Sequence, residues 1–251
     1  TVHGPAHREI ASGYGLSLEH PTVVWLRELE REAYLAADAV ISVDNAHAEY
    51  VRSFGRTGGI WVVPNFVDTR RFHRDVALHS LGPATEAFVA GRPIVLCPRR
   101  LVPKNGVDVA IRAVRQLADG NMPCVLFVAG DGPQRRDLEL LTERLGAVTQ
   151  VRFLGAVSPL SMPGWLRRAE AVVVPSVHHK GIEEATSISV LEAQACARPV
   201  IASAIGGLRE VVEDGVNGFL VPAGSADALA GAIARVILDP GLGSKLGTPA
   251  A

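Results

Sequence analysis

The sequence predicts an α/β fold with parallel sheets and helices on both faces. From Pro93 onward, short apolar runs alternate repeatedly with longer amphipathic segments, and this alternation is typical of consecutive βαβ units. The chain has 251 residues, of which 48% are hydrophobic and 20% charged. These values are those of a globular protein large enough to bury a sizeable core without disulfide bonds.

Residues 1–75 show a looser version of the same alternation. A strand end at Val2 precedes a polar, glycine-containing loop over residues 4–18. The apolar spacing then predicts a helix, a buried strand, a short helix and a second strand. These elements cover residues 22–37, 39–43, 45–54 and 60–63.

The second half carries the clearer pattern. Residues 76–92 are rich in helix breakers and are interpreted as a linker with one short helix. The predicted strands cover residues 94–97, 125–129, 151–154, 172–174, 200–202 and 219–221, and the predicted helices cover 107–117, 134–145, 159–169, 208–212 and 226–238. The sequence thus divides into a first domain (1–75), a linker (76–92), a second domain (93–240) and a tail (241–251).

Charge and cysteine content exclude several classes of protein. The net charge of −1 gives no general attraction to nucleic acid or to an anionic membrane. Three cysteines without metal-ligand spacing, Cys97, Cys124 and Cys196, indicate buried thiols in a reducing, cytoplasmic compartment. No apolar run is long enough to cross a membrane and no signal segment is visible. Because the chain begins with Thr1, we expect an upstream part to precede it.

The chemically informative residues lie in loops that follow predicted strands. Parallel sheets bind ligands beyond the carboxyl ends of their strands. A basic loop containing Arg99, Arg100 and Lys104 follows the first strand of the second domain, and such cations can clamp a diphosphate. A solvated basic loop without a ligand is the alternative for this segment taken alone.

Two carboxylates, Glu184 and Glu192, flank the start of another predicted helix. Ser187 and Ser189 are suitable N-caps, and the positive end of this helix would favour an anion such as a phosphate. Residues 189–192 also fit a capping box, in which Glu192 only bonds the backbone of its own helix. The pattern by itself leaves both interpretations open.

Other catalytic motifs are missing from the sequence. Residues 130–135 lack the third glycine of a dinucleotide fingerprint, and there is no P-loop and no serine nucleophile elbow. No cluster has metal-ligand spacing. We therefore expect no metal and no cofactor.

Taken together, the motifs resemble the retaining glycosyltransferases of family four, which have the GT-B fold of two Rossmann-like domains. The resemblance rests on the order and spacing of residues 1–4, 37–43, 63–68, 100–108, 128–133, 151–155, 174–176 and, most specifically, 184–207. It implies that residues 1–75 are the remainder of an incomplete N-terminal acceptor-side domain. It also implies that residues 93–240 bind the donor.

The resemblance further implies transfer of a hexose-type sugar from a UDP- or GDP-sugar to an acceptor hydroxyl, with retention of configuration and without metal. Glu184 would lie beside the donor sugar, with His3 reaching toward it, and Glu192 would bind the ribose. The backbone near Val157 would hold the base. Arg100 or Arg99, with Lys104, would stabilise the leaving diphosphate, helped by backbone N–H groups of Thr186, Ser187, Ile188 and Ser189.

Some assignments stay open at this point. Arg99 and Lys104 have the family's usual Arg-x4-Lys spacing, but the neighbouring residues align Arg100 with the arginine and Asn105 with the lysine. The acceptor could be a saccharide, a lipid-linked compound or a small molecule, and a lipid would imply peripheral contact with the inner face of the membrane. The alternatives are a fragment that binds the donor without turnover, or a sugar-nucleotide epimerase of the same fold.

Overall fold

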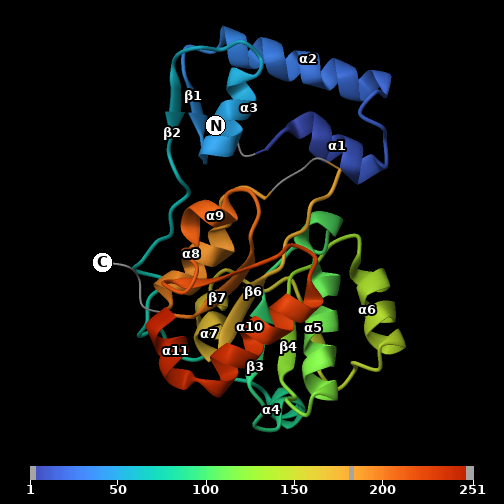
Figure 1. Cartoon of the computed structure of the whole chain (residues 1–251), viewed down its shortest axis with the longest axis vertical. Helices are drawn as coiled ribbons and strands as arrows, with labels where there is room; N and C mark the ends of the chain where they lie inside the picture. Colours follow the sequence, from blue (N-terminus) through green and yellow to red (C-terminus); the bar gives the residue numbers. More distant parts are fainter. Residues whose placement is uncertain (1–3, 181–183, 247–251) are drawn as a thin grey trace.

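The computed structural model describes residues 4–180 and 184–246 and shows two lobes of unequal size (Figure 1). The smaller lobe is built from the first part of the chain. It contains α1 (Ala6–Tyr14), α2 (Pro21–Ala36), β1 (Val40–Ser42), α3 (Asn45–Arg52) and β2 (Ile60–Val62). The strands β1 and β2 form a parallel pair, with Val40 opposite Ile60.

The larger lobe is organised around a six-stranded parallel sheet in the order β5-β4-β3-β6-β7-β8. Its strands are β3 (Ile94–Cys97), β4 (Val125–Ala129), β5 (Val151–Gly155), β6 (Ala171–Val174), β7 (Val200–Ser203) and β8 (Gly218–Val221). The chain order reverses between β3 and β6, where a parallel sheet of this kind places its ligand crevice. The predicted parallel α/β architecture is confirmed.

Helices cover both faces of this sheet (Figure 1). They are α4 (Pro83–Val89), the short 3-10 helix η1 (Pro103–Asn105), α5 (Val107–Asp119), α6 (Arg135–Arg144), α7 (Met162–Arg168), α8 (Ile188–Ala195), α9 (Leu208–Val211), α10 (Ala226–Leu238) and α11 (Pro240–Leu246). The helix α4 lies in the predicted linker. The helix α11 lies mostly in the predicted tail and buries Leu246 against the core.

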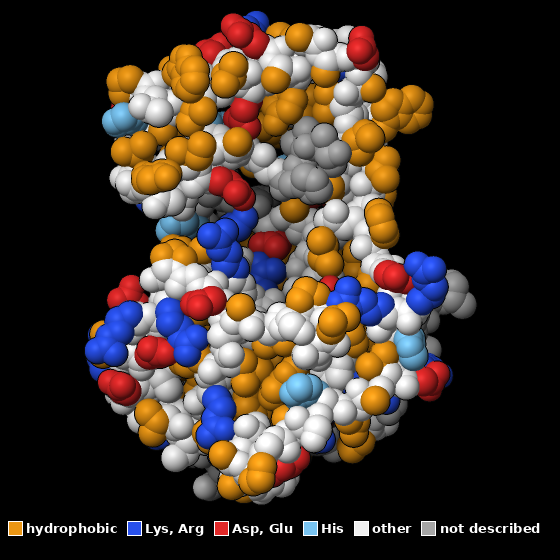
Figure 2. All heavy atoms as spheres, turned by 180° about the vertical axis from the view of Figure 1, so that it is seen from behind, with side chains coloured by type: hydrophobic (Ala, Val, Ile, Leu, Met, Phe, Trp, Pro, Cys, Tyr) orange, Lys and Arg blue, Asp and Glu red, His pale blue; other side chains and the backbone are white. Residues whose placement is uncertain are grey.

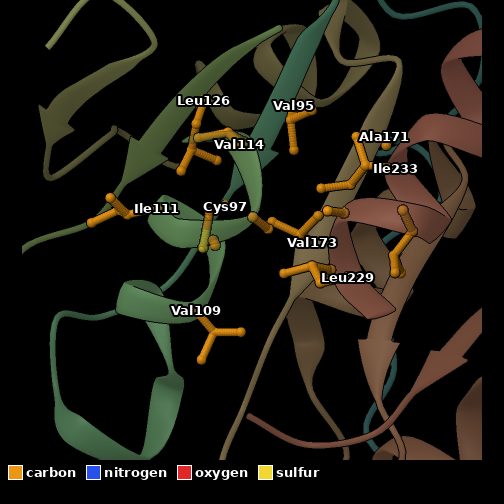
Figure 3. Close-up of a cluster of buried hydrophobic side chains, with 14 of the residues drawn as sticks. Val95, Cys97, Val109, Ile111, Val114, Leu126, Ala171, Val173, Leu229 and Ile233 are labelled. Carbon is orange, nitrogen blue, oxygen red and sulfur yellow. The ribbon is translucent and has the colours of Figure 1, made fainter. Parts of the chain in front are cut away.

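The sheet faces explain why the central strands are apolar throughout. Every residue of β3, β4, β6 and β7 is buried, as expected for strands covered on both faces. On one face, Val95, Cys97 and Val173 pack against residues of α5 and α10 such as Val114 and Ile233 (Figure 3). The three cysteines are buried free thiols, and burial raises the pKa of Cys97 to about 12.

One predicted segment is wrong. Residues 4–18 were expected to form a loop, but residues 6–14 form α1, which ends at Gly15 in the left-handed conformation. The helix is held by tertiary contacts, because His7 is buried and its Nδ1 lies 2.5 Å from Glu30 Oε2 on α2. Its sequence is polar, so helical periodicity alone did not reveal it.

Candidate active site

The waist between the two lobes gathers basic, acidic and histidine side chains (Figure 2). It lies at the carboxyl edge of the large sheet, where the loops after β3, β6 and β7 end. Two segments of the smaller lobe face these loops. Glu9 of α1 contacts Lys104, and Asn45 of α3 contacts Glu210 of α9. The candidate site is therefore built from both parts of the chain.

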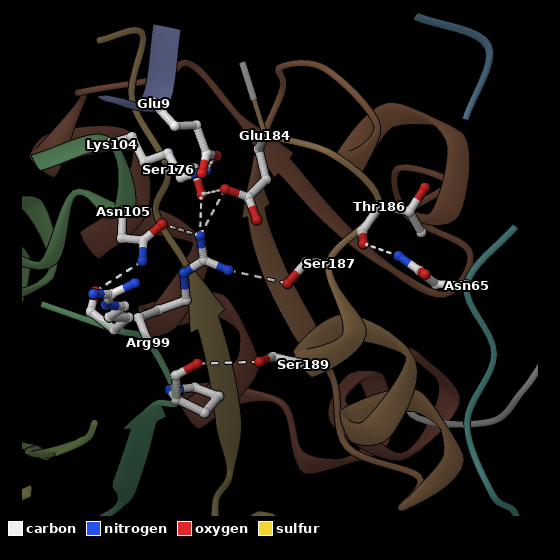
Figure 4. A network of polar contacts seen from close by, with 12 residues as sticks. Glu9, Asn65, Arg99, Lys104, Asn105, Ser176, Glu184, Thr186, Ser187 and Ser189 are labelled. Atoms are coloured by element: carbon white, nitrogen blue, oxygen red, sulfur yellow. Dashed lines mark hydrogen bonds and ion pairs between the residues drawn. The ribbon is translucent and has the colours of Figure 1, made fainter. Parts of the chain in front are cut away.

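Arg99 occupies the centre of this site (Figure 4). Its side chain is only 7% exposed, and its Nη2 donates to Glu184 Oε2 at 2.8 Å. The same nitrogen donates to Ser176 Oγ at 3.0 Å and to Asn105, while Nη1 donates to Ser187 Oγ at 3.0 Å. A planar guanidinium can serve several acceptors at once. Arg99 thus joins the loops after β3 and β6 to the start of α8.

The loop before α8 is fixed by a close approach of two glycines. Gly206 has a φ of +47°, and a Cβ there would lie 2.2 Å from the Glu184 carbonyl oxygen. A Cβ at Gly207 would lie 2.5 Å from Thr186 N, and Gly207 N donates to the Glu184 carbonyl at 2.8 Å. Any side chain at either position would displace the segment that carries Glu184.

The beginning of α8 differs in detail from the expected caps. The helix starts at Ile188, and Ser187 stands at the N-cap position, but no side chain there bonds the backbone. The Ser187 hydroxyl accepts from Arg99 instead, and Ser189 Oγ donates to the Pro98 carbonyl at 3.1 Å. The capping-box interpretation of residues 189–192 is therefore wrong. The first turn keeps uncapped N–H groups near the cleft, which suits an anion.

Glu192 is partly buried in the first turns of α8, and no hydrogen bond reaches its side chain from the part of the chain that the structure describes. Burial raises the pKa of Glu192 above its ordinary value, and nearby Arg71 opposes part of that rise. A desolvated carboxylate without a protein partner is a strong acceptor for ligand hydroxyl groups.

The other two cations lie differently from Arg99. Arg100 is exposed, and Lys104 Nζ lies 2.8 Å from Glu9 Oε1. Both border a pocket of about 750 Å³ between the lobes, lined by Glu9, Ser12, Gly13, Tyr14, Arg100, Val102, Pro103, Lys104, Asn105, Pro133, Gln134 and Asp137. A volume of this size lies within the usual range for ligand sites.

The smaller lobe contacts the loop before α8 from the opposite side of the cleft. Asn65 Nδ2 donates to the Thr186 carbonyl at 2.8 Å, and Thr186 Oγ1 donates to the Val43 carbonyl at 3.4 Å. Asp44 is fully buried and caps α3 by accepting from His47 N and His47 Nδ1 at 2.7 and 2.6 Å. Although burial opposes its ionisation, these hydrogen bonds keep the pKa of Asp44 below its ordinary value.

Three residues of this site are not among the candidate site residues that the sequence predicts. Asn65 and Ser176 lie near strand ends, but only their partners far along the chain, Thr186 and Arg99, reveal them. Asp44 follows β1 and bonds His47, three residues further on. Val157 lies in the loop after β5 and packs against the core beside Leu154. His3 lies outside the described residues.

Within residues 4–180 and 184–246, no group of three or more His, Cys, Asp or Glu side chains is arranged to hold a metal ion. No helix in these ranges has both the length and the apolar character needed to cross a membrane.

Comparison with models of known protein families shows the family of this chain. The model of the glycosyl transferases group 1 matches residues 83–250, and that of Glycosyltransferase Family 4 matches residues 1–71. The chain belongs to the group 1 glycosyltransferases. Its fold is of the GT-B type.

Curated relatives of this glycosyltransferase chain match over most of its length. It is 30% identical over 246 residues to a GDP-mannose-dependent alpha-(1-6)-phosphatidylinositol monomannoside mannosyltransferase of Mycolicibacterium smegmatis, covering 96% of this chain and 64% of the relative. It is 37% identical to a D-inositol 3-phosphate glycosyltransferase of Kribbella flavida, covering 88% and 53%. The chain therefore spans between about half and two thirds of these two relatives.

Solved structures agree with the fold. The Anabaena protein HepE in complex with UDP-glucose superimposes with a TM-score of 0.75 at 26% identity, covering 90% of this chain and 60% of that one. Sucrose-phosphate synthase from Thermosynechococcus elongatus gives a TM-score of 0.74 at 27% identity, covering 94% and 58%.

Proposed function

We propose that this chain carries the donor site of an enzyme that moves a sugar from a nucleoside diphosphate sugar to an acceptor hydroxyl, with retention of configuration. The observation that carries the proposal is the pair of carboxylates on either side of the α8 start. Glu184 is held by Arg99 at 2.8 Å, whereas no hydrogen bond or ion pair holds the Glu192 side chain among the described residues. One is fixed in place and the other is free for a ligand.

The donor would lie across the start of α8. Its diphosphate would face the backbone N–H groups of residues 186–189, where the positive end of the helix dipole stabilises negative charge. Glu192 would accept from the two ribose hydroxyls, and the base would lie near Val157. Glu184 would then stand beside the sugar, and His3 would reach toward the same sugar.

Charge develops on the departing diphosphate, so cations placed there lower the barrier. Arg99 contacts Asn105, which is, with Lys104, one of the two candidates for the lysine position of the family pattern. We infer that the Arg99 guanidinium supplies positive charge beside that position, and that Arg100 and Lys104 add charge from the open side. No metal is needed in this scheme.

The chemical classes of the donor and the acceptor are part of this proposal. HepE was solved with UDP-glucose, and the mycobacterial relative is named for GDP-mannose and a lipid-linked acceptor. A UDP- or GDP-hexose is therefore the donor class to test, with a saccharide, polyol or lipid-linked acceptor. A lipid-linked acceptor would bring the enzyme to the inner face of the membrane, and the buried free thiols suit a cytoplasmic location.

Calorimetric titration with UDP-glucose and GDP-mannose tests the donor site. We expect binding of at least one of them, weakened about tenfold by Glu192→Gln, because a lost charge-assisted hydrogen bond is worth about 1.4 kcal/mol or more. Glu143→Gln on exposed α6 is the matched control and should leave affinity unchanged. No binding of either compound, or equal binding by both variants, would contradict the proposal.

A second possibility is that this chain binds the donor without turning it over. The chain spans 64% of one curated relative described above and 53% of the other, and this shorter span favours the second possibility. Proton NMR of the product from a panel of acceptors separates the cases. Donor binding without any product supports the second possibility, and a product with inverted configuration would contradict retention.

A further inference from the structure

A second, smaller pocket of about 250 Å³ lies away from the cleft and is lined by Arg74, Asp75, Arg167, Ala197 and Arg198. Its three arginines come from three separate segments. Arg74 belongs to the connection between the lobes, Arg167 to α7, and Arg198 to the turn between α8 and β7. The fold thus brings three arginines from distant parts of the chain to the wall of one small cavity.

This pocket is separate from the donor site. Arg198 lies two residues before the start of β7 and Arg167 lies shortly before β6, so both stand at the amino edge of the sheet. The cleft lies at the carboxyl edge. Four strand residues at about 3.3 Å each put roughly 13 Å between the two edges.

The three arginines outnumber Asp75, the one acidic residue that lines the pocket. Among residues 4–180 and 184–246, none of the three arginines forms an ion pair with a carboxylate. Arg198 donates from Nε to the Ala197 carbonyl at 2.9 Å and from Nη1 to the Ala169 carbonyl at 3.3 Å. These contacts orient its guanidinium, and the Glu170 carboxylate attracts it without forming an ion pair.

Two further features indicate that the grouping of these arginines is energetically unfavourable without a ligand. The Nε of Arg167 is buried without a hydrogen-bond partner in the described structure, and buried donors normally have one. Burial, followed by repulsion from Arg167, lowers the pKa of Arg198, and attraction by Glu170 opposes part of this shift. A bound anion would satisfy the donor and relieve the repulsion.

We propose that this pocket binds a phosphate monoester of a small polyhydroxyl compound. Three guanidinium groups around one cavity match the several oxygens of a phosphate group. Asp75 also lines the pocket, and its carboxylate would accept from a hydroxyl of the ligand. The volume lies below the usual range for drug-sized ligands, so a nucleotide-sugar does not fit.

The test is calorimetric titration of the whole chain with inorganic phosphate and with glycerol 3-phosphate. We expect both to bind, the ester more tightly, and Arg74→Gln and Arg167→Gln each to weaken binding about tenfold. Arg74 is exposed, so its variant should fold, and thermal unfolding without phosphate checks this. Arg70→Gln, outside the pocket, is the matched control and should bind as the parent does.

Two comparisons can overturn the proposal. Lys104→Gln changes the cleft but not this pocket, so phosphate binding lost in Lys104→Gln and kept in Arg74→Gln would place the anion in the cleft. Sedimentation with vesicles of phosphatidic acid tests a lipid headgroup as the source of the phosphate. Binding to vesicles alone, or no binding of either soluble compound at millimolar concentration, would refute a site for a soluble ester.

Discussion

Arg99 and Glu184 form a buried ion pair at 2.8 Å, with side chains 7% and 11% exposed. The pair connects the loop after β3 with the loop before α8, which are 85 residues apart in sequence. Glu184, the carboxylate proposed to lie beside the donor sugar, is therefore held by Arg99. The sequence also makes this arginine a candidate for binding the diphosphate.

Removing the guanidinium should be costly. Arg99→Gln leaves the Glu184 carboxylate buried without its cation, and breaking a buried pair in this way typically costs about 3 kcal/mol or more. Urea unfolding of the variant measures this loss. Arg112→Gln, which breaks an exposed pair on α5, should cost less than about 1 kcal/mol. Similar losses for the two variants would show that Arg99 does not stabilise the loop.

Glu192→Gln distinguishes a ligand-binding carboxylate from a capping one. Because burial raises the pKa of Glu192, its ionisation in the folded protein opposes folding. The free energy of unfolding should therefore fall as pH rises from the ordinary value of 4.5 through the raised pKa. The variant should lack this dependence and be at least as stable as the parent at neutral pH. A loss of about 1 kcal/mol, as for a broken cap, would contradict this.

The same ionisation should govern donor affinity. The ribose hydroxyls need an ionised acceptor, so affinity should decline as pH falls through the raised pKa of Glu192, starting above the range of an ordinary glutamate. Titrations of the donor across this pH range, in parent and Glu192→Gln, provide the measurement. Parallel pH profiles for the two proteins would assign the dependence to another group.

Asp44 should stabilise the contact between α3 and the loop before α8, which carries Thr186. Its pKa lies below the ordinary value of 3.8, so its contribution is complete above that value and is lost as pH falls through the lowered pKa. Asp44→Asn keeps a capping residue but removes the charge that faces His47, and we expect a loss of about 1–2 kcal/mol at neutral pH. Asp38→Asn, at an exposed position, is the control for urea unfolding.

Glu9 partly neutralises Lys104, the cation at the edge of the cleft. The Lys104–Glu9 pair has side chains 28% and 50% exposed, so Glu9→Gln should change stability by less than about 1 kcal/mol. It releases Lys104 for the diphosphate, and donor affinity should rise, most clearly at low salt. Glu19→Gln, at an exposed position beyond α1, serves as the control. Unchanged or lower affinity in Glu9→Gln would exclude Lys104 from the donor site.

The large sheet could be predicted because its strands are short, continuously apolar and separated by periodic helices. The segment at 125–129 and the helix at 226–238 were predicted with the bounds that β4 and α10 have. The helix α1 was missed because His7 and Glu30 stabilise it from different parts of the chain. A clearer signal was available in Pro5 before the helix and Gly15 after it.

The residues of the candidate site could be predicted less completely than the large sheet. Strand ends indicated the loops that carry Arg99 and Glu184 and the start of the helix that carries Glu192, since ligand sites in parallel sheets lie there. The sequence did not reveal that Arg99 would be buried between Asn105 and Glu184 while Arg100 stays exposed. Adjacent residues on one loop point in different directions, and only the packing of distant segments decides which is buried.

The central claim is that a nucleoside diphosphate sugar lies across the start of α8. A crystal structure of the chain soaked with UDP-glucose or GDP-mannose, whichever binds, tests it most directly. We predict ribose hydroxyls within hydrogen-bonding distance of Glu192 and a diphosphate at the backbone N–H groups of residues 186–189. A nucleotide bound elsewhere, with Glu192 free of contact, would contradict the account.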